Sequence, residues 1–124
     1  MKMLNKTLDR ALSTKRPHGA AATVKFSHWL ADNLPLHLSA SFDACGNLHV
    51  DARASDQNRT LFVAHVDTVH RKAGKNRIKK TRTHWHADGD VLGADDGAGC
   101  AMLMHLIHSG VPAYYIFTVG EEKG

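Results

Sequence analysis

Two short apolar runs limit the folds open to this chain more than any other feature. Residues 60–66, TLFVAHV, and residues 113–119, AYYIFTV, are each almost unbroken in apolar character. Runs of this length predict strands that are covered on both faces. Between them, apolar residues recur at helical spacing before a glycine stop at Gly110; they are Met102, Leu103, Leu106 and Ile107. The order strand, helix, strand predicts an α/β fold with parallel strands.

The residues before the first run predict two helices and a hairpin. Residues 3–13 and 20–33 carry apolar side chains at helical spacing, and KRPHG at 15–19 separates the two segments. Residues 36–50 alternate apolar and polar side chains around a turn at 45–47, which predicts a β-hairpin. The core candidates of the second helix are Val24, Trp29 and Leu30.

A basic segment follows the first apolar run. Seven of the 16 lysine and arginine residues lie at 71–82, RKAGKNRIKKTR. Such a cluster can bind nucleic acid or another acidic surface. No aromatic residues alternate with these charges, as single-strand binding would require, so a solvated loop excursion over 71–87 is the favoured interpretation.

The length, the cysteines and the lack of a long apolar run predict a cytoplasmic protein without a membrane partner. At 124 residues the chain is one domain or a piece of one. Cys45 and Cys100 form no CxxC pair and suggest reduced thiols in the cytoplasm. The first twelve residues, MKMLNKTLDRAL, have no apolar core for a signal peptide, and no run is long enough to span a bilayer.

Imidazole and carboxylate side chains gather where these predicted elements begin or end. They are His65 and Asp67 after the first run, Asp95 and Asp96 before the helix, and Glu121 and Glu122 after the second run. Ligand sites of open parallel sheets lie beyond the carboxyl ends of the strands, so these groups are expected to meet. Each pair has a plain structural interpretation, as a hydrogen-bonded pair, a helix cap or a solvated turn. Their combination favours a functional site.

The residue types suit a zinc site. His65 would offer a ring nitrogen, and Asp95 or Glu122 would offer oxygen. Alternate strand residues face one side, so the Asp67 carboxylate could accept a hydrogen bond from the other ring nitrogen of His65. Adjacent side chains diverge in an extended chain, so one glutamate would bind metal while the other takes a proton from water.

Three stretches, FVAHVDTV, VLGADDGAG and FTVGEEKG, resemble in order and spacing the dinuclear zinc exopeptidases. This family includes peptidase T, carboxypeptidase G and the aminoacylases, and the glutamyl aminopeptidases are similar. The resemblance covers roughly residues 19–124. It implies that residues 1–124 are the N-terminal portion of a catalytic domain, with a mixed, largely parallel sheet and flanking helices.

The resemblance also implies roles for five residues. His65 would bind one metal ion, with Asp67 as its orienting partner. Asp95 would bridge two Zn²⁺ ions, with Co²⁺ or Mn²⁺ as alternatives, and Glu122 would bind the second. Glu121 would be the general base, and the substrate would be a small peptide or an N-acyl amino acid.

Three further expectations follow from the family pattern. The peptide bond between Asp95 and Asp96 would be cis. Family members place another acidic ligand and a late histidine further along the chain, so the metal site is expected to be incomplete in this chain alone. A homo-oligomer or a complementing C-terminal chain are therefore candidate partners. The alternative function is a non-catalytic fragment that binds metal or nucleic acid.

Overall fold

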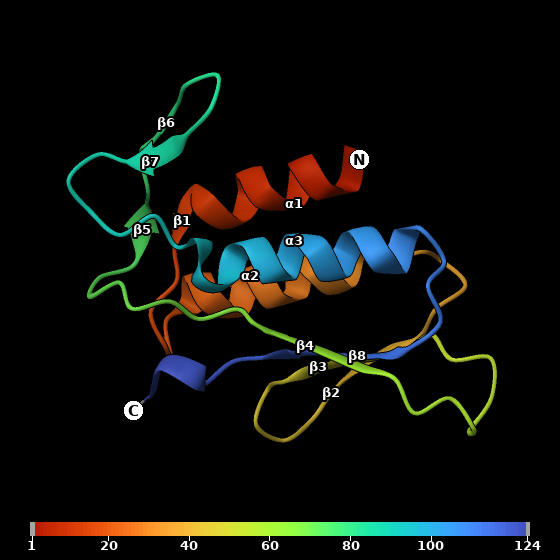
Figure 1. Ribbon diagram of the computed structural model, residues 1–124. Coiled ribbons are helices and arrows are strands. Elements are labelled where there is room, and N and C mark those ends of the chain that lie inside the picture. The colour runs from red at the N-terminus through yellow and green to blue at the C-terminus, as the bar shows by residue number, and fades with distance from the viewer. Residues whose placement is uncertain (1, 124) are drawn as a thin grey trace.

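Three helices lie on one face of a four-stranded sheet in the computed structural model, which describes residues 2–123 (Figure 1). The helices are α1 (Lys2–Leu12), α2 (Ala21–Asp32) and α3 (Ala94–His108). The sheet contains β2 (Ala40–Phe42), β3 (Leu48–Asp51), β8 (Tyr114–Thr118) and β4 (Leu61–His65), in that order. Within residues 2–123, no helix has both the length and the apolarity needed to cross a bilayer.

The sheet is mixed, as the sequence predicts. β4 and β8 are parallel, and the register pairs Leu61 with Tyr114 and His65 with Thr118. β8 is antiparallel to β3, and β3 is antiparallel to β2. Because β4 and β8 run together, their carboxyl ends lie at the same edge of the sheet.

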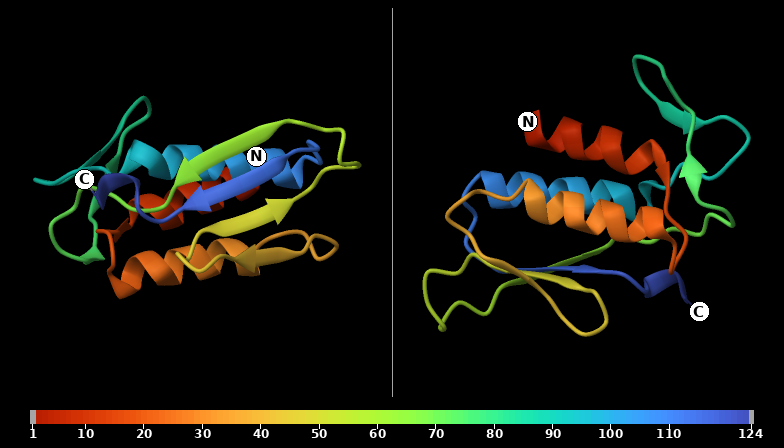
Figure 2. Two further views of the ribbon diagram at one scale, coloured as in Figure 1. Left: turned by 90° about the horizontal axis from the view of Figure 1, so that it is seen from below. Right: turned by 180° about the vertical axis from the view of Figure 1, so that it is seen from behind.

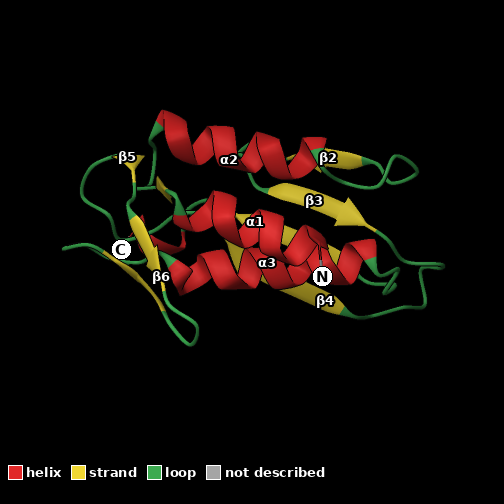
Figure 3. Cartoon of the chain, turned by 90° about the horizontal axis from the view of Figure 1, so that it is seen from above, coloured by secondary structure: helices red, strands yellow, loops and turns green. Residues whose placement is uncertain are grey.

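The core lies between the helices and one face of the sheet. Seen from above, α1 lies beside α3, and α2 lies over the end of the sheet formed by β2 and β3 (Figure 3). Side chains alternate along β8, so that Tyr115 and Phe117 are fully buried. They meet Leu30 of α2 and Met104 of α3 in one apolar cluster.

The prediction that the apolar runs are covered on both faces is wrong for β4. Leu61 and Val63 are 54% and 52% exposed. Seen from below, the face of the sheet opposite the three helices is open over the described residues (Figure 2). A continuous apolar run therefore did not reveal that the helices cover one face only.

Two smaller predictions are also corrected. Val24, a core candidate, is 52% exposed, whereas Leu30 is fully buried. The first strand of the hairpin begins at Ala40 and not at Leu36. The backbone N–H of Leu38 donates to the carbonyl of Pro35 at 3.0 Å, and this turn delays the strand.

The basic segment contains short strands instead of a loop alone. β5 (Gly74–Lys75) pairs with β1 (Thr14–Lys15), and β6 (Ile78–Lys80) pairs with β7 (Trp85–Ala87). The β6–β7 hairpin projects away from the sheet (Figure 1).

Candidate metal centre

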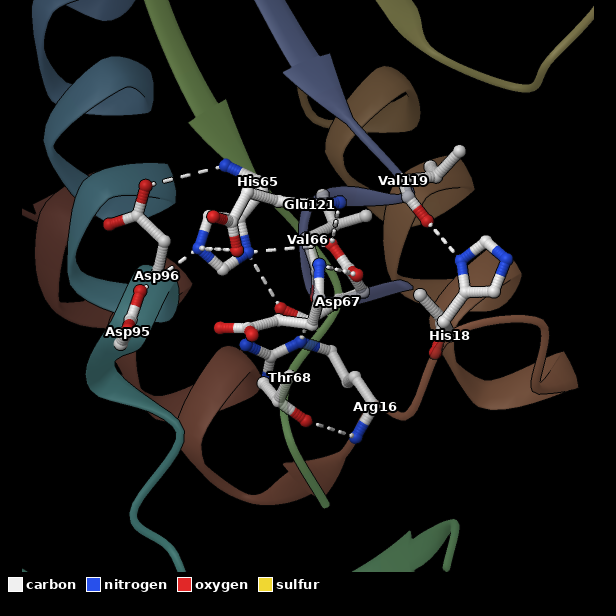
Figure 4. Close-up of polar contacts among 12 residues, drawn as sticks. Arg16, His18, His65, Val66, Asp67, Thr68, Asp95, Asp96, Val119 and Glu121 are labelled. Atoms are coloured by element: carbon white, nitrogen blue, oxygen red, sulfur yellow. Dashed lines mark hydrogen bonds and ion pairs between the residues drawn. The ribbon is translucent and has the colours of Figure 1, made fainter. Parts of the chain in front are cut away.

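The site lies at the edge of the sheet where β4 and β8 both end (Figure 4). His65 is the last residue of β4. Glu121 begins the 3₁₀ turn η1 (Glu121–Lys123), shortly after β8. Asp95 lies in the first turn of α3, the helix that connects the two strands. The parallel register therefore brings together residues that are far apart in the sequence.

His65 is the centre of this cluster. Its side chain is only 11% exposed, and its Nδ1 lies 2.8 Å from the backbone carbonyl oxygen of Asp67. Nε2 lies 2.9 Å from Oδ1 of Asp95 and 3.6 Å from Oε2 of Glu121. Burial alone would lower the pKa of His65, but the contacts with Asp67 and Asp95 outweigh it, so the pKa is raised.

The Asp67 carboxylate forms an ion pair with His65, but its hydrogen bonds go to another part of the chain. It lies 3.4 Å from Nδ1 of His65, whose hydrogen bond goes to the Asp67 backbone carbonyl. Its two oxygens accept hydrogen bonds from the backbone N–H groups of Glu121, at 3.3 Å, and Glu122, at 2.8 Å. Asp67 is fully buried. It therefore ties the end of β4 to the turn that carries both glutamates.

The two glutamates lie on a turn and not on an extended chain. The sequence interpretation assumed diverging side chains, whereas His65, Glu121 and Glu122 each offer a ligand atom within 4.8 Å of the others. Desolvation, followed by the charges of Glu121 and Asp95, raises the pKa of Glu122. Negative charge is therefore concentrated at this point.

At the start of α3, the side chains of Asp95 and Asp96 have different contacts. The peptide bond between Asp95 and Asp96 is cis, as the resemblance implies. The Asp96 carboxylate accepts hydrogen bonds from the backbone N–H groups of Gly99, at 3.0 Å, and His65, at 3.3 Å. A Cβ atom at Gly99 would clash with this carboxylate, so a larger residue there would displace the Asp96 side chain. The Asp95 side chain, 85% exposed, is left facing the ring of His65.

The sequence did not indicate a role for Arg16, whose side chain donates hydrogen bonds to the backbone next to the site. This residue is fully buried, and its Nε donates to the carbonyl of Val66 at 2.7 Å. Its other nitrogens donate to carbonyls of Ala11, Thr14 and Gly93. Arg16 thus joins α1, the end of β4 and the start of α3. An arginine before a proline gives no sign of burial in a single sequence.

The donor set fits a divalent metal ion. It combines one buried imidazole with several carboxylates, which is a ligand chemistry that zinc accepts. Across the described part of the chain, Asp95 and Glu121 form ion pairs with His65 and with no lysine or arginine. Within the described residues, a bound cation would therefore not compete with a lysine or arginine for these two carboxylates.

The fold matches solved structures of peptidases. An aminoacylhistidine dipeptidase from Vibrio alginolyticus matches with a TM-score of 0.74 at 23% identity, over 98% of this chain and 28% of that one. A tripeptidase from Staphylococcus aureus matches with a TM-score of 0.75 at 22% identity, over 98% of this chain and 37% of that one. The aminopeptidase PepT from Bacillus cereus matches with a TM-score of 0.71 at 24% identity, over 98% of this chain and 37% of that one.

These matches confirm the expected fold class, and peptidase T is among the proteins that the motifs resemble. The chain spans 28% to 37% of the length of these structures. No protein-family model matches the sequence, and no curated protein matches it. At identities below 25%, the likeness establishes the fold.

Proposed function

We propose that the chain carries part of the active site of a metal-dependent hydrolase, which cleaves peptide or N-acyl-amino-acid amide bonds. The main observation in support is the cluster of His65, Glu121 and Glu122, with ligand atoms within 4.8 Å of one another. The contact between His65 and Asp95 adds a further carboxylate. The likeness in fold to a dipeptidase, a tripeptidase and an aminopeptidase supports the same reaction class.

Each residue of the cluster has a defined part in this proposal. His65, Asp95 and Glu122 would hold two zinc ions, with Asp95 contributing to both. When bound, such ions polarise an amide carbonyl and lower the pKa of water. Glu121, exposed beside His65, accepts the proton of the attacking water at its carboxylate and returns it to the departing amine. Asp67 positions Glu121 and Glu122 through their backbone N–H groups.

The substrate would be a small peptide or an N-acyl amino acid. We propose that further ligands come from chain equivalent to the rest of the matched structures, either as a complementing chain or in a homo-oligomer. Metal binding by the present residues is therefore the first property to measure.

Zinc titration of the chain, followed by calorimetry, tests the metal centre. Zinc should bind, and Asp95→Asn or Glu122→Gln should weaken binding by at least the roughly ten- to hundredfold that the loss of an outer-shell partner costs, because each change removes a charged ligand oxygen. Asp56→Asn is the matched control, because Asp56 is exposed on a loop away from the site. A folded chain that binds zinc no better than Asp95→Asn does would refute the metal centre.

A panel of small peptides and N-acyl amino acids, with zinc or cobalt added and the chain mixed with a complementing C-terminal chain, tests the reaction. Glu121→Gln should abolish cleavage while zinc binding survives, because its main part is proton transfer. Cleavage that does not depend on metal, or that survives Glu121→Gln, would refute the proposed mechanism.

The alternative, a nucleic-acid-binding fragment, has less support. Lys79 and Lys80 of the projecting hairpin already form ion pairs with Asp88 and Asp9. Oligonucleotide binding that falls steeply with salt, without hydrolysis, would favour this alternative.

A further inference from the structure

A second concave site lies beside the metal centre. It is a cavity of about 300 Å³ between the N-terminal half of α2 and the β2–β3 hairpin. Its walls include the apolar side chains of Val24, Phe42 and Val119. The ring of His28 stacks on Phe42 with centroids 4.5 Å apart, which makes one wall aromatic. The metal centre uses none of these side chains.

The cavity adjoins a groove that extends to Glu121 of the metal centre. This groove, of about 630 Å³, shares His18, Cys45 and Val119 with the cavity and extends past Gly120 to Glu121. Nδ1 of His18 lies 2.8 Å from the carbonyl oxygen of Val119, which fixes the ring at the junction (Figure 4). A ligand held at Glu121 could therefore extend a side chain past His18 into the cavity.

The lining of the cavity favours an uncharged, apolar group. Among the described residues that line it, none is a lysine, arginine, aspartate or glutamate. Its two imidazoles are already engaged, since His18 contacts the Val119 carbonyl and His28 stacks on Phe42. A charged side chain would therefore lose hydration there without a partner of fixed opposite charge. Ser27 also lines the cavity; it is 2% exposed, and within residues 2–123 its hydroxyl has no hydrogen-bond partner. Apolar walls with one or two placed polar groups are the usual composition of a ligand pocket.

The size of the cavity limits what it can hold. Pockets for whole small-molecule ligands range from about 300 to 1,000 Å³, so a cavity at the lower limit suits one part of a ligand. An aromatic side chain would pack against Phe42, Val24 and Val119.

We propose that this cavity is the subsite for an aromatic side chain of the peptide or N-acyl amino acid that is bound at the metal centre. The assignment as a substrate subsite rests on the proposed hydrolase function. The binding of an aromatic amino-acid derivative in the cavity is independent of that function, because it can be measured without metal and without turnover.

Cys45 provides the measurement, because it is exposed and lines both the cavity and the groove. The other cysteine, Cys100, is buried. The rate at which a chromogenic disulfide reagent modifies the native chain therefore reports on Cys45. The probes are N-acetyl-L-phenylalanine amide, N-acetylglycine amide and the amide of N-acetyl-L-glutamate.

The phenylalanine derivative should slow the modification of Cys45 about tenfold at a concentration about ten times its Kd, by mass action. The glycine and glutamate derivatives should not slow it at equal concentration. Val24→Trp should fill the cavity from its exposed rim and abolish the protection. Lys25→Trp is the matched control, because Lys25 is the adjacent exposed residue of α2 and does not line the cavity; protection should survive in it.

Three results would overturn the proposal in a chain shown to be folded by circular dichroism. They are no protection by the phenylalanine derivative, equal protection by the glycine derivative, and protection that survives Val24→Trp. Protection in a chain that neither binds zinc nor cleaves peptides would uphold the pocket and overturn its assignment to a substrate. Metal-dependent cleavage without protection would overturn the pocket and leave the hydrolase function intact.

Discussion

Replacement of Arg16 should destabilise the protein more than any change to an exposed charge. The Arg16 guanidinium is fully buried and donates to the carbonyls of Val66, at 2.7 Å, and Thr14, at 3.0 Å, and also to those of Ala11 and Gly93. Its Cζ lies 4.8 Å from the centroid of the Phe26 ring. Arg16→Met keeps much of the volume and removes every donor.

The magnitude follows from the acceptors that are left behind. The carbonyls of Ala11 and Val66 belong to fully buried residues, and each buried acceptor without a donor costs about 1–3 kcal/mol. Removing the desolvated charge of Arg16 offsets part of this cost. Two such acceptors cost about 2–6 kcal/mol together, and after this offset we expect a net loss of about 2–4 kcal/mol. Since a domain is stable by about 5–15 kcal/mol, the loss is a large share of the total.

Urea unfolding followed by far-ultraviolet circular dichroism measures this loss. Arg82→Met is the matched control, because Arg82 is exposed on the projecting hairpin and the change should alter stability by about 0.5 kcal/mol or less. Arg16→Lys should fall between the wild type and Arg16→Met, because an ammonium group retains the charge without the planar fork. A loss for Arg16→Met equal to that of Arg82→Met would refute the role of Arg16 as the link beneath the metal centre.

Three further predictions concern single groups. Asp67→Asn should lower stability by about 1–3 kcal/mol in urea unfolding, because an amide nitrogen would replace one of the two buried oxygens that accept hydrogen bonds from the backbone of η1; stability equal to wild type would contradict this placement. Hydrogen bonds from His49 and Asn47 lower the pKa of Asp43 below its ordinary 3.8, so Asp43 stabilises the folded chain above about pH 4 and this contribution is lost as the pH falls toward the lowered pKa. Urea unfolding at a series of pH values should therefore show an acid loss that Asp43→Asn reduces, and an unchanged acid loss in that variant would count against it. Burial raises the pKa of Cys100 to about 12, so a thiol reagent should modify one cysteine in the native chain and two in urea, and rapid modification of both in the native chain would contradict the burial of Cys100.

The fold was predictable where the signal is local. The apolar runs at 60–66 and 113–119 gave β4 and β8, and helical spacing gave α3 between them. The parallel pairing of β4 and β8 follows from the general order strand, helix, strand. The open face of β4 did not follow, because a continuous apolar run does not tell how many layers cover a strand.

The sequence determined which chemical groups stand at the ends of the strands. His65, Glu121 and Glu122 are functional candidates because an imidazole and carboxylates follow apolar strands, and this is a property of residue order alone. Only the tertiary structure decided what those groups contact. It directs the Asp67 carboxylate to the backbone of η1, and it buries Arg16 beneath the site. Hydrogen-bond partners and burial depend on the packing of residues distant in the chain, and no local pattern of a single sequence records that packing.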